Sequence, residues 1–117
     1  LFLLIQYLKN NSFLYYKTAS FKKLIQNKTQ ERALQNIPPL PLNLEEVKEL
    51  CSILTSNDYH YKDSPFLLNL LKNRITPGVD ETSKYKAEFL QKICKYQTYC
   101  NIITPQEAIR ILGTMQG

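Results

Sequence analysis

Helix-ending and helix-starting signals divide this chain into short segments, and within them apolar residues recur three and four positions apart. That spacing places apolar side chains along one face of an α-helix. A half-buried β-strand would instead need apolar and polar residues in strict alternation, and no segment shows this pattern. The sequence therefore predicts an all-α fold of about five helices.

The predicted helices cover residues 21–36, 44–56, 64–75, 81–96 and 105–112. Ser20 is the expected N-cap of the first helix. Asn43 with Glu46, and Thr104 with a glutamate three residues later, have the spacing of residues that cap a helix N-terminus. The proline-rich segment 37–42 is expected to form a stiff connector, with recognition by an SH3-like partner as the alternative.

The apolar positions also predict which side of each helix is buried. In the first helix the expected buried positions are Phe21, Leu24, Ile25, Ala33 and Leu34. In the fourth helix the expected core face is Tyr85, Phe89, Leu90, Ile93, Cys94 and Tyr96.

The helix starts repeat along the chain. The second and fourth helices begin 37 residues apart, and the third and fifth begin 40 residues apart. This period is typical of HEAT and armadillo hairpins. Residues 21–117 are therefore predicted to form a HEAT-like superhelical domain, incomplete at its C-terminal end, because two hairpins bury little and need neighbours. Residues 1–20 are predicted to be a poorly ordered extension.

The net charge of +5 is confined to the first third of the chain. Residues 38–117 carry nine basic and nine acidic side chains, so residues 1–37 hold the whole excess. A neutral remainder argues against a basic face across the domain. The basic, aromatic-rich stretch 1–28 leaves open RNA binding by stacking and charge neutralisation. Three glycines allow neither of the common phosphate-binding loops.

Few side chains could carry catalysis. His60, the only histidine, stands in a polar segment and is either a general base, a metal ligand or simply solvated. Pairing of His60 with a cysteine nucleophile would require the fold to bring them together. Glu45, Glu46 and Glu49 could form an acid–base pair, but acidic residues also suit a helix N-terminus. We predict no catalytic, cofactor-binding or metal-binding residue.

Cys51, Cys94 and Cys100 form no CxxC pair. A disulfide framework needs paired cysteines in a secreted chain, so we expect buried thiols and a cytoplasmic protein. The apolar run at residues 1–5 is far shorter than the roughly 20 residues that a membrane helix needs, so no membrane association is expected. Because the sequence starts without Met, we expect it to begin within a longer chain.

Several short motifs occur in the order found in one family. They are Glu31-Arg32-Ala33, Pro39-Leu40-Pro41-Leu42, the stretch from Phe66 to Arg74, the stretch from Thr76 to Glu81, Leu90, and the stretch from Thr104 to Ile109 that leads into Leu112–Gly117. Together they resemble the N-terminal HEAT-like domain of aconitate hydratase B. Residues 1–20 match nothing in that family, and the loop 57–64 is longer than usual.

The resemblance implies a parent enzyme of the tricarboxylic acid cycle. Members isomerise citrate and isocitrate through cis-aconitate, and many hydrate 2-methylaconitate, using a [4Fe–4S] cluster held by three cysteines as Lewis acid. Those cysteines lie in the family's distant catalytic domains, and none of the three here matches them. The chain is therefore expected to be inactive alone, with the catalytic domains as its partner.

The alternative is a free-standing module. It would bind a partner protein, a second copy of itself as a homodimer, or RNA.

Overall fold

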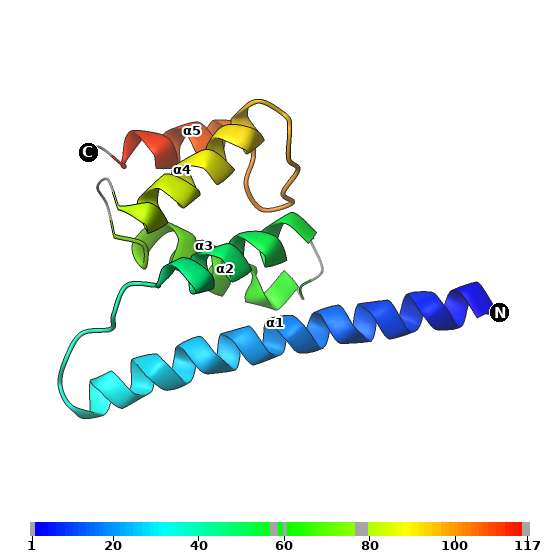
Figure 1. Ribbon diagram of the computed structural model, residues 1–117, viewed down its shortest axis with the longest axis horizontal. Helices are drawn as coiled ribbons and strands as arrows, with labels where there is room; N and C mark the ends of the chain where they lie inside the picture. The colour runs from blue at the N-terminus through cyan, green and yellow to red at the C-terminus, as the bar shows by residue number, and fades with distance from the viewer. Residues whose placement is uncertain (1, 57–58, 60, 77–79, 116–117) are drawn as a thin grey trace.

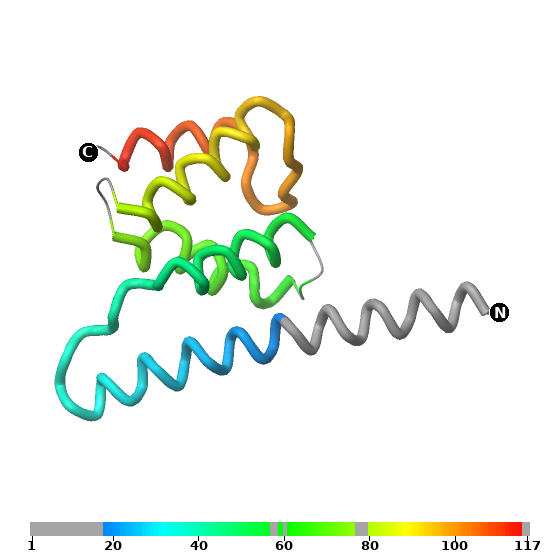
Figure 2. Tube along the Cα trace, in the orientation of Figure 1, coloured from blue at the N-terminus to red at the C-terminus, as the bar shows by residue number. Residues whose placement is uncertain are grey.

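The computed structural model describes the backbone of residues 2–56, 59, 61–76 and 80–115, and the side chains in these ranges from Thr18 onward. Figure 2 draws in colour the part described with side chains. His60 lies outside the described residues. Every element of regular secondary structure in these residues is a helix, which confirms the predicted all-α fold class. The elements are α1 Phe2–Leu34, α2 Leu44–Ser56, the short 3-10 helix η1 Tyr61–Asp63, α3 Ser64–Asn73, α4 Glu81–Cys94 and α5 Pro105–Gly113 (Figure 1).

The short helices pair as neighbours in the chain. α2 contacts α3, α4 contacts α5, and α4 also packs on α2, so that the two pairs share one interior. In Figure 1, α1 runs along the other side of the α2–α3 pair. This pairing is what a repeated helical hairpin requires. The finer HEAT-like assignment stays a prediction.

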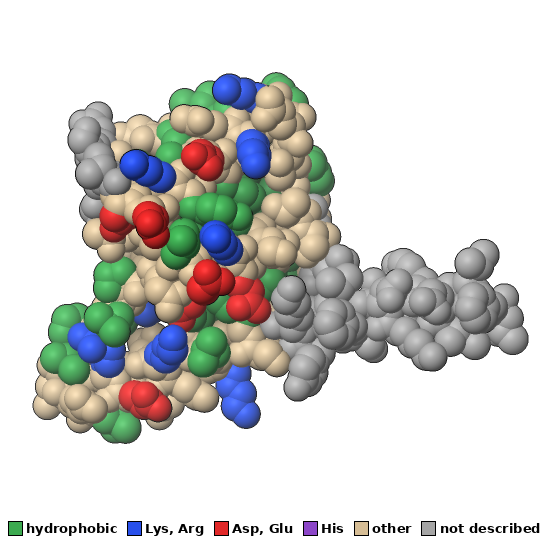
Figure 3. All heavy atoms as spheres, in the orientation of Figure 1, with side chains coloured by type: hydrophobic (Ala, Val, Ile, Leu, Met, Phe, Trp, Pro, Cys, Tyr) green, Lys and Arg blue, Asp and Glu red, His purple; other side chains and the backbone are tan. Residues whose placement is uncertain are grey.

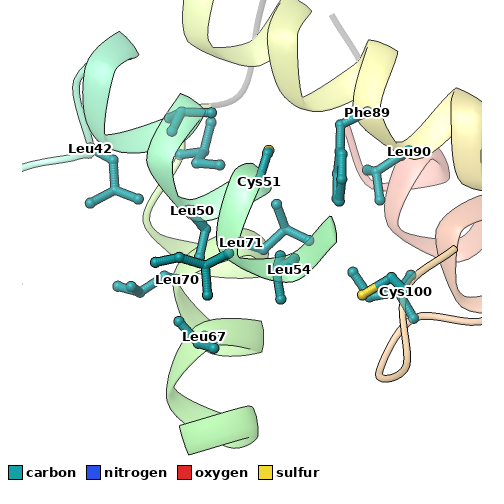
Figure 4. Packing of buried hydrophobic residues seen from close by; sticks show 14 of the residues in the cluster. Leu42, Leu50, Cys51, Leu54, Leu67, Leu70, Leu71, Phe89, Leu90 and Cys100 are labelled. Carbon is teal, nitrogen blue, oxygen red and sulfur yellow. The ribbon is translucent and has the colours of Figure 1, made fainter. Parts of the chain in front are cut away.

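One apolar core joins the two hairpins. Leu50 and Leu54 of α2, Leu71 of α3 and Leu90 of α4 are fully buried (Figure 4). Among the described side chains of α1, from Thr18 onward, Phe21 and Ile25 belong to this core. Most of the described core therefore comes from the hairpins.

Side-chain caps start the last two helices. The Asp80 carboxylate accepts a hydrogen bond from Ser83 N at 2.9 Å, and the Thr104 hydroxyl accepts one from Glu107 N at 3.1 Å. Each bond satisfies an amide that has no partner within its own helix. The cap predicted at Thr104 is confirmed.

The start predicted for the first helix is wrong. α1 begins at Phe2, so Ser20 is an interior helical residue and not an N-cap. Neither proline nor glycine occurs between residues 2 and 34, and an interior serine weakens a helix only slightly. The predicted buried stripe is also too wide, because Leu24 and Leu34 are 46% and 79% exposed and Ala33 is exposed.

Three helices end earlier than predicted, and one of them is α3, which ends at Asn73 instead of residue 75. α1 stops at Leu34 and α4 at Cys94, because Asn36 and Tyr96 adopt φ of 56° and 59°. Each is the left-handed residue of a Schellman motif. The following amides donate back to the carbonyls of Arg32 and Lys92. Tyr96 is consequently 81% exposed, and its predicted place in the core is wrong.

Candidate functional site

The three thiols do not form a metal centre. Cys51 and Cys100 are buried in the core, whereas Cys94 is half-buried and its Sγ lies 3.8 Å from the Pro105 carbonyl oxygen. Burial raises the pKa of Cys51 to about 12 and also raises the pKa of Cys100. A cluster ligand must be a thiolate, which burial among apolar groups disfavours. No group of three or more metal-binding side chains occurs among the described residues. These thiols therefore do not fit a [4Fe–4S] cluster.

The carboxylates at the start of α2 have separate environments. Glu45 is exposed and Glu49 is half-buried. Glu46 is buried, and its Oε1 accepts a hydrogen bond from Asn43 N at 2.9 Å while Asn43 Oδ1 accepts from Glu46 N at 2.8 Å. This reciprocal pair confirms the predicted N-cap. Its second oxygen, Oε2, is 3.0 Å from Lys28 Nζ, so Glu46 also holds α1.

Two ion pairs join α1 to the hairpins. Lys28 reaches the cap of α2, and Lys22 Nζ lies 2.7 Å from an oxygen of Asp63 at the end of η1. The Lys22 ammonium is also 5.7 Å from the ring centre of Phe66, a distance at which a cation–π attraction acts. These contacts determine where the narrow face of α1 sits on α2, η1 and α3.

Arg74 connects three segments at the other end of this interface. Its Nη2 donates to the Leu40 carbonyl at 2.8 Å, and its Nη1 donates to the Thr29 hydroxyl at 3.3 Å. Its own carbonyl accepts from Leu42 N at 2.7 Å. We call Lys22, Lys28, Glu46, Asp63 and Arg74, with these partners, the α1 seam.

In the sequence, Arg74 stands at the end of the Phe66–Arg74 stretch, within the helix predicted over residues 64–75, and no contact with α1 was predicted for it. Its link to Leu40 joins the Pro39-Leu40-Pro41-Leu42 motif to the end of the Phe66–Arg74 motif. The sequence showed both motifs, but it did not show that Arg74 brings them into contact.

Most of the basic side chains in the described part of α1 have partners within the chain. Lys22 and Lys28 form ion pairs, and Arg32 Nε donates to the Pro38 carbonyl at 2.7 Å. On the face seen in Figure 3, cationic and anionic side chains are interspersed over the described helices. On this face, the described basic side chains therefore do not form a continuous cationic patch of the kind that binds nucleic acid.

Three of the open pockets on the described surface have volumes of about 340 Å³ or more. One, of about 440 Å³, lies between α2 and α4 and includes Cys51 and Glu88. Another, of about 340 Å³, lies along the α1 seam and includes Lys28 and Arg74. The third, of about 540 Å³, lies where α3 and α5 end and includes Lys86. The pocket that includes Cys51 also includes Glu88, but burial raises the pKa of the Cys51 thiol to about 12, which disfavours the nucleophilic thiolate.

No helix in the described part of the chain combines the length and the apolar character needed to cross a bilayer.

Comparison with known proteins identifies one family. Residues 24–117 match the family model described as the aconitate B N-terminal domain. The aconitate hydratases B of Synechocystis sp. and Escherichia coli are each 42% identical over 87 residues, which is 74% of this chain and 10% of each relative. The enzyme of Pseudomonas aeruginosa is 42% identical over 88 residues, 75% of this chain and 10% of its own length. The chain thus spans about a tenth of the length of these relatives.

Proposed function

The chain belongs to the family of aconitate hydratase B N-terminal domains, and from this premise we propose that it serves as the helical N-terminal module of an aconitate hydratase B. The observation that carries the proposal is the family match over residues 24–117, a range that contains every residue of the described core except Phe21. The parent reaction is the interconversion of citrate and isocitrate, with hydration of 2-methylaconitate as a further activity. We place this function in the cytoplasm.

In this proposal the module supports the enzyme and does not perform the chemistry. The buried, protonated thiols of Cys51 and Cys100 are unsuited to hold the cluster, so its ligands belong to the catalytic domains. Those domains are the partner that we propose for the helical hairpins. Two hairpins offer little interior of their own, and repeats of this kind gain stability from neighbours.

An assay of the 117-residue chain alone tests the claim of inactivity. After iron–sulfur reconstitution with citrate as substrate, we expect no formation of cis-aconitate or isocitrate above the rate of a protein-free blank. Turnover that scales with the concentration of the chain would contradict the proposal.

A chimera tests the supporting role. Residues 24–117 would replace the matching segment of the Escherichia coli relative, and the same segment would be deleted in a parallel variant. We expect the chimera to retain citrate isomerisation that the deletion variant loses in large part. Equal activity of the chimera and the deletion variant would contradict a supporting role.

Homodimer formation and RNA binding are the alternative partner proposals, and each has a direct test. Sedimentation at several concentrations measures self-association of the chain. RNA binding through residues 1–28 predicts an affinity that falls steeply with salt and is lost when these residues are deleted. Affinity that survives the deletion would exclude this RNA-binding mode.

A further inference from the structure

A charged pocket lies where α3 and α5 end, and its lining includes Asn73 and Ile75, which flank Arg74 of the α1 seam in the chain. It is formed by the last turn of α3 and the residues after it, by α4, and by α5 with the residues after it, and it has a volume of about 540 Å³. Its charged lining residues are Lys72, Lys86, Arg110 and Glu107. Ile75 and Ile111 form part of its apolar floor.

Lys86 is the unusual member of this lining. It is only 3% exposed, although lysine is almost never buried without a partner. No carboxylate of the described chain lies within 4.0 Å of its ammonium group. Burial also lowers the pKa of Lys86, because desolvation disfavours the charged form of its ammonium group.

The other charges of the pocket leave a positive excess. Glu107 Oε1 lies 2.9 Å from Arg110 Nη1, so the one acidic lining residue is already paired. Lys72, Lys86 and Arg110 against Glu107 leave two positive charges in excess. Two of the neighbouring polar groups are also engaged, because Asn73 Nδ2 donates to Asn69 and the Thr114 hydroxyl donates to the Ile111 carbonyl. A complementary ligand would therefore bring negative charge and hydrogen-bond acceptors.

We propose that this pocket binds a small dianion, such as inorganic phosphate or a free dicarboxylate, with Lys86 as the central charge and Lys72 and Arg110 at its rim. A dianion would neutralise the excess charge, and its oxygens would accept hydrogen bonds from the ammonium group that lacks a described carboxylate partner. The apolar floor would shield these bonds from water, which strengthens them. The proposal does not depend on the parent enzyme's reaction.

Calorimetric titration of the 117-residue chain tests this proposal. Phosphate and succinate would be added at constant ionic strength, slightly above neutral pH, with acetate as the monoanion control. We expect saturable binding of at least one dianion, and weaker binding of acetate. In nuclear magnetic resonance spectra, the same dianion should shift the amide signals of Ile75, Lys86 and Thr114. Absence of saturable binding of both dianions would overturn the proposal.

Matched variants locate the bound anion. Lys86→Met keeps the apolar stem and removes the charge, and we expect it to weaken dianion binding about tenfold or more. Lys84→Met alters an exposed lysine of the same helix and should leave the affinity unchanged. If Lys86→Met fails to fold, the double variant Lys72→Gln with Arg110→Gln replaces it, with an expected loss of about threefold or more. If the folded pocket variant bound the dianion as tightly as Lys84→Met does, the assignment of the anion to this pocket would be overturned.

Discussion

Asn36 and Tyr96 adopt the left-handed conformation that glycine tolerates best, and each ends a helix. Asparagine enters this region with little penalty, whereas a tyrosine Cβ crowds the following carbonyl. Tyr96 is 81% exposed, so its ring gains little from packing that could offset this strain. The strain at Tyr96 is thus a local consequence of the chain reversal after α4.

Replacement of Tyr96 by glycine should therefore stabilise the domain. We expect the free energy of unfolding of Tyr96→Gly to rise by about 1 kcal/mol, because the strain at positive φ is removed. Urea denaturation measures this change. Tyr99→Gly is the control, since Tyr99 is also exposed but does not have a positive φ, and it should give no gain. Equal effects of the two substitutions would contradict the strain argument.

The Cys51 thiol predicts a dependence of stability on alkaline pH. Burial raises its pKa from 9.0 to about 12, so above pH 9.0 the unfolded chain loses this proton more readily than the folded chain. Stability contributed by the protonated thiol is complete below pH 9.0 and is lost as pH rises towards about 12. Cys51→Ala should show a shallower alkaline decline in thermal unfolding temperature than the parent chain, relative to its own value at neutral pH. An unchanged decline in Cys51→Ala would contradict this role.

In the described part of α1, polar contacts to the hairpins are prominent. Phe21 and Ile25 are the apolar residues that its described side chains contribute to the core, and the ion pairs and Arg74 form the α1 seam. Polar links between elements depend on geometry, and an arginine offers several fixed donors to one group of acceptors. Arg74 thus explains how the connector 37–42, α1 and the end of α3 are held together.

Arg74→Met should loosen this interface while the hairpins stay folded. We expect a loss of about 1–3 kcal/mol in unfolding free energy, because the Leu40 carbonyl and the Thr29 hydroxyl lose their donor. Hydrogen exchange should become faster at Leu42, whose amide bonds to the Arg74 carbonyl. Lys95→Met is the matched control, since Lys95 is the exposed C-cap of α4. Equal exchange in both variants would argue against the proposed link.

For the molecule as a whole, the two hairpins share one core and should unfold together. Leu54 of α2 is fully buried between elements of both hairpins (Figure 4). Loss of a side chain at such a position leaves a cavity that the surrounding helices fill only in part. The effect should therefore reach both hairpins.

Leu54→Ala should lower the unfolding free energy by about 3 kcal/mol, a large share of the stability of a small domain. Leu34→Ala, at a position 79% exposed, should change it by less than about 0.5 kcal/mol. Denaturation followed by circular dichroism and by tyrosine fluorescence measures both variants. Separate transitions for the two probes would show that the hairpins do not form one cooperative unit.

The sequence by itself determined the helical class, the hairpin spacing and the caps at Asn43 and Thr104, because these depend on hydrogen bonds and periodicity within a few residues. Tertiary structure decided the rest. Lys28 meets Glu46 across 18 positions, and Arg74 meets Thr29 across 45. The burial of Lys86 likewise follows from how α4 packs on α2 and α5. Such contacts arise only when helices distant in the chain are brought together, so local patterns could not reveal which cations are structural and which line a pocket.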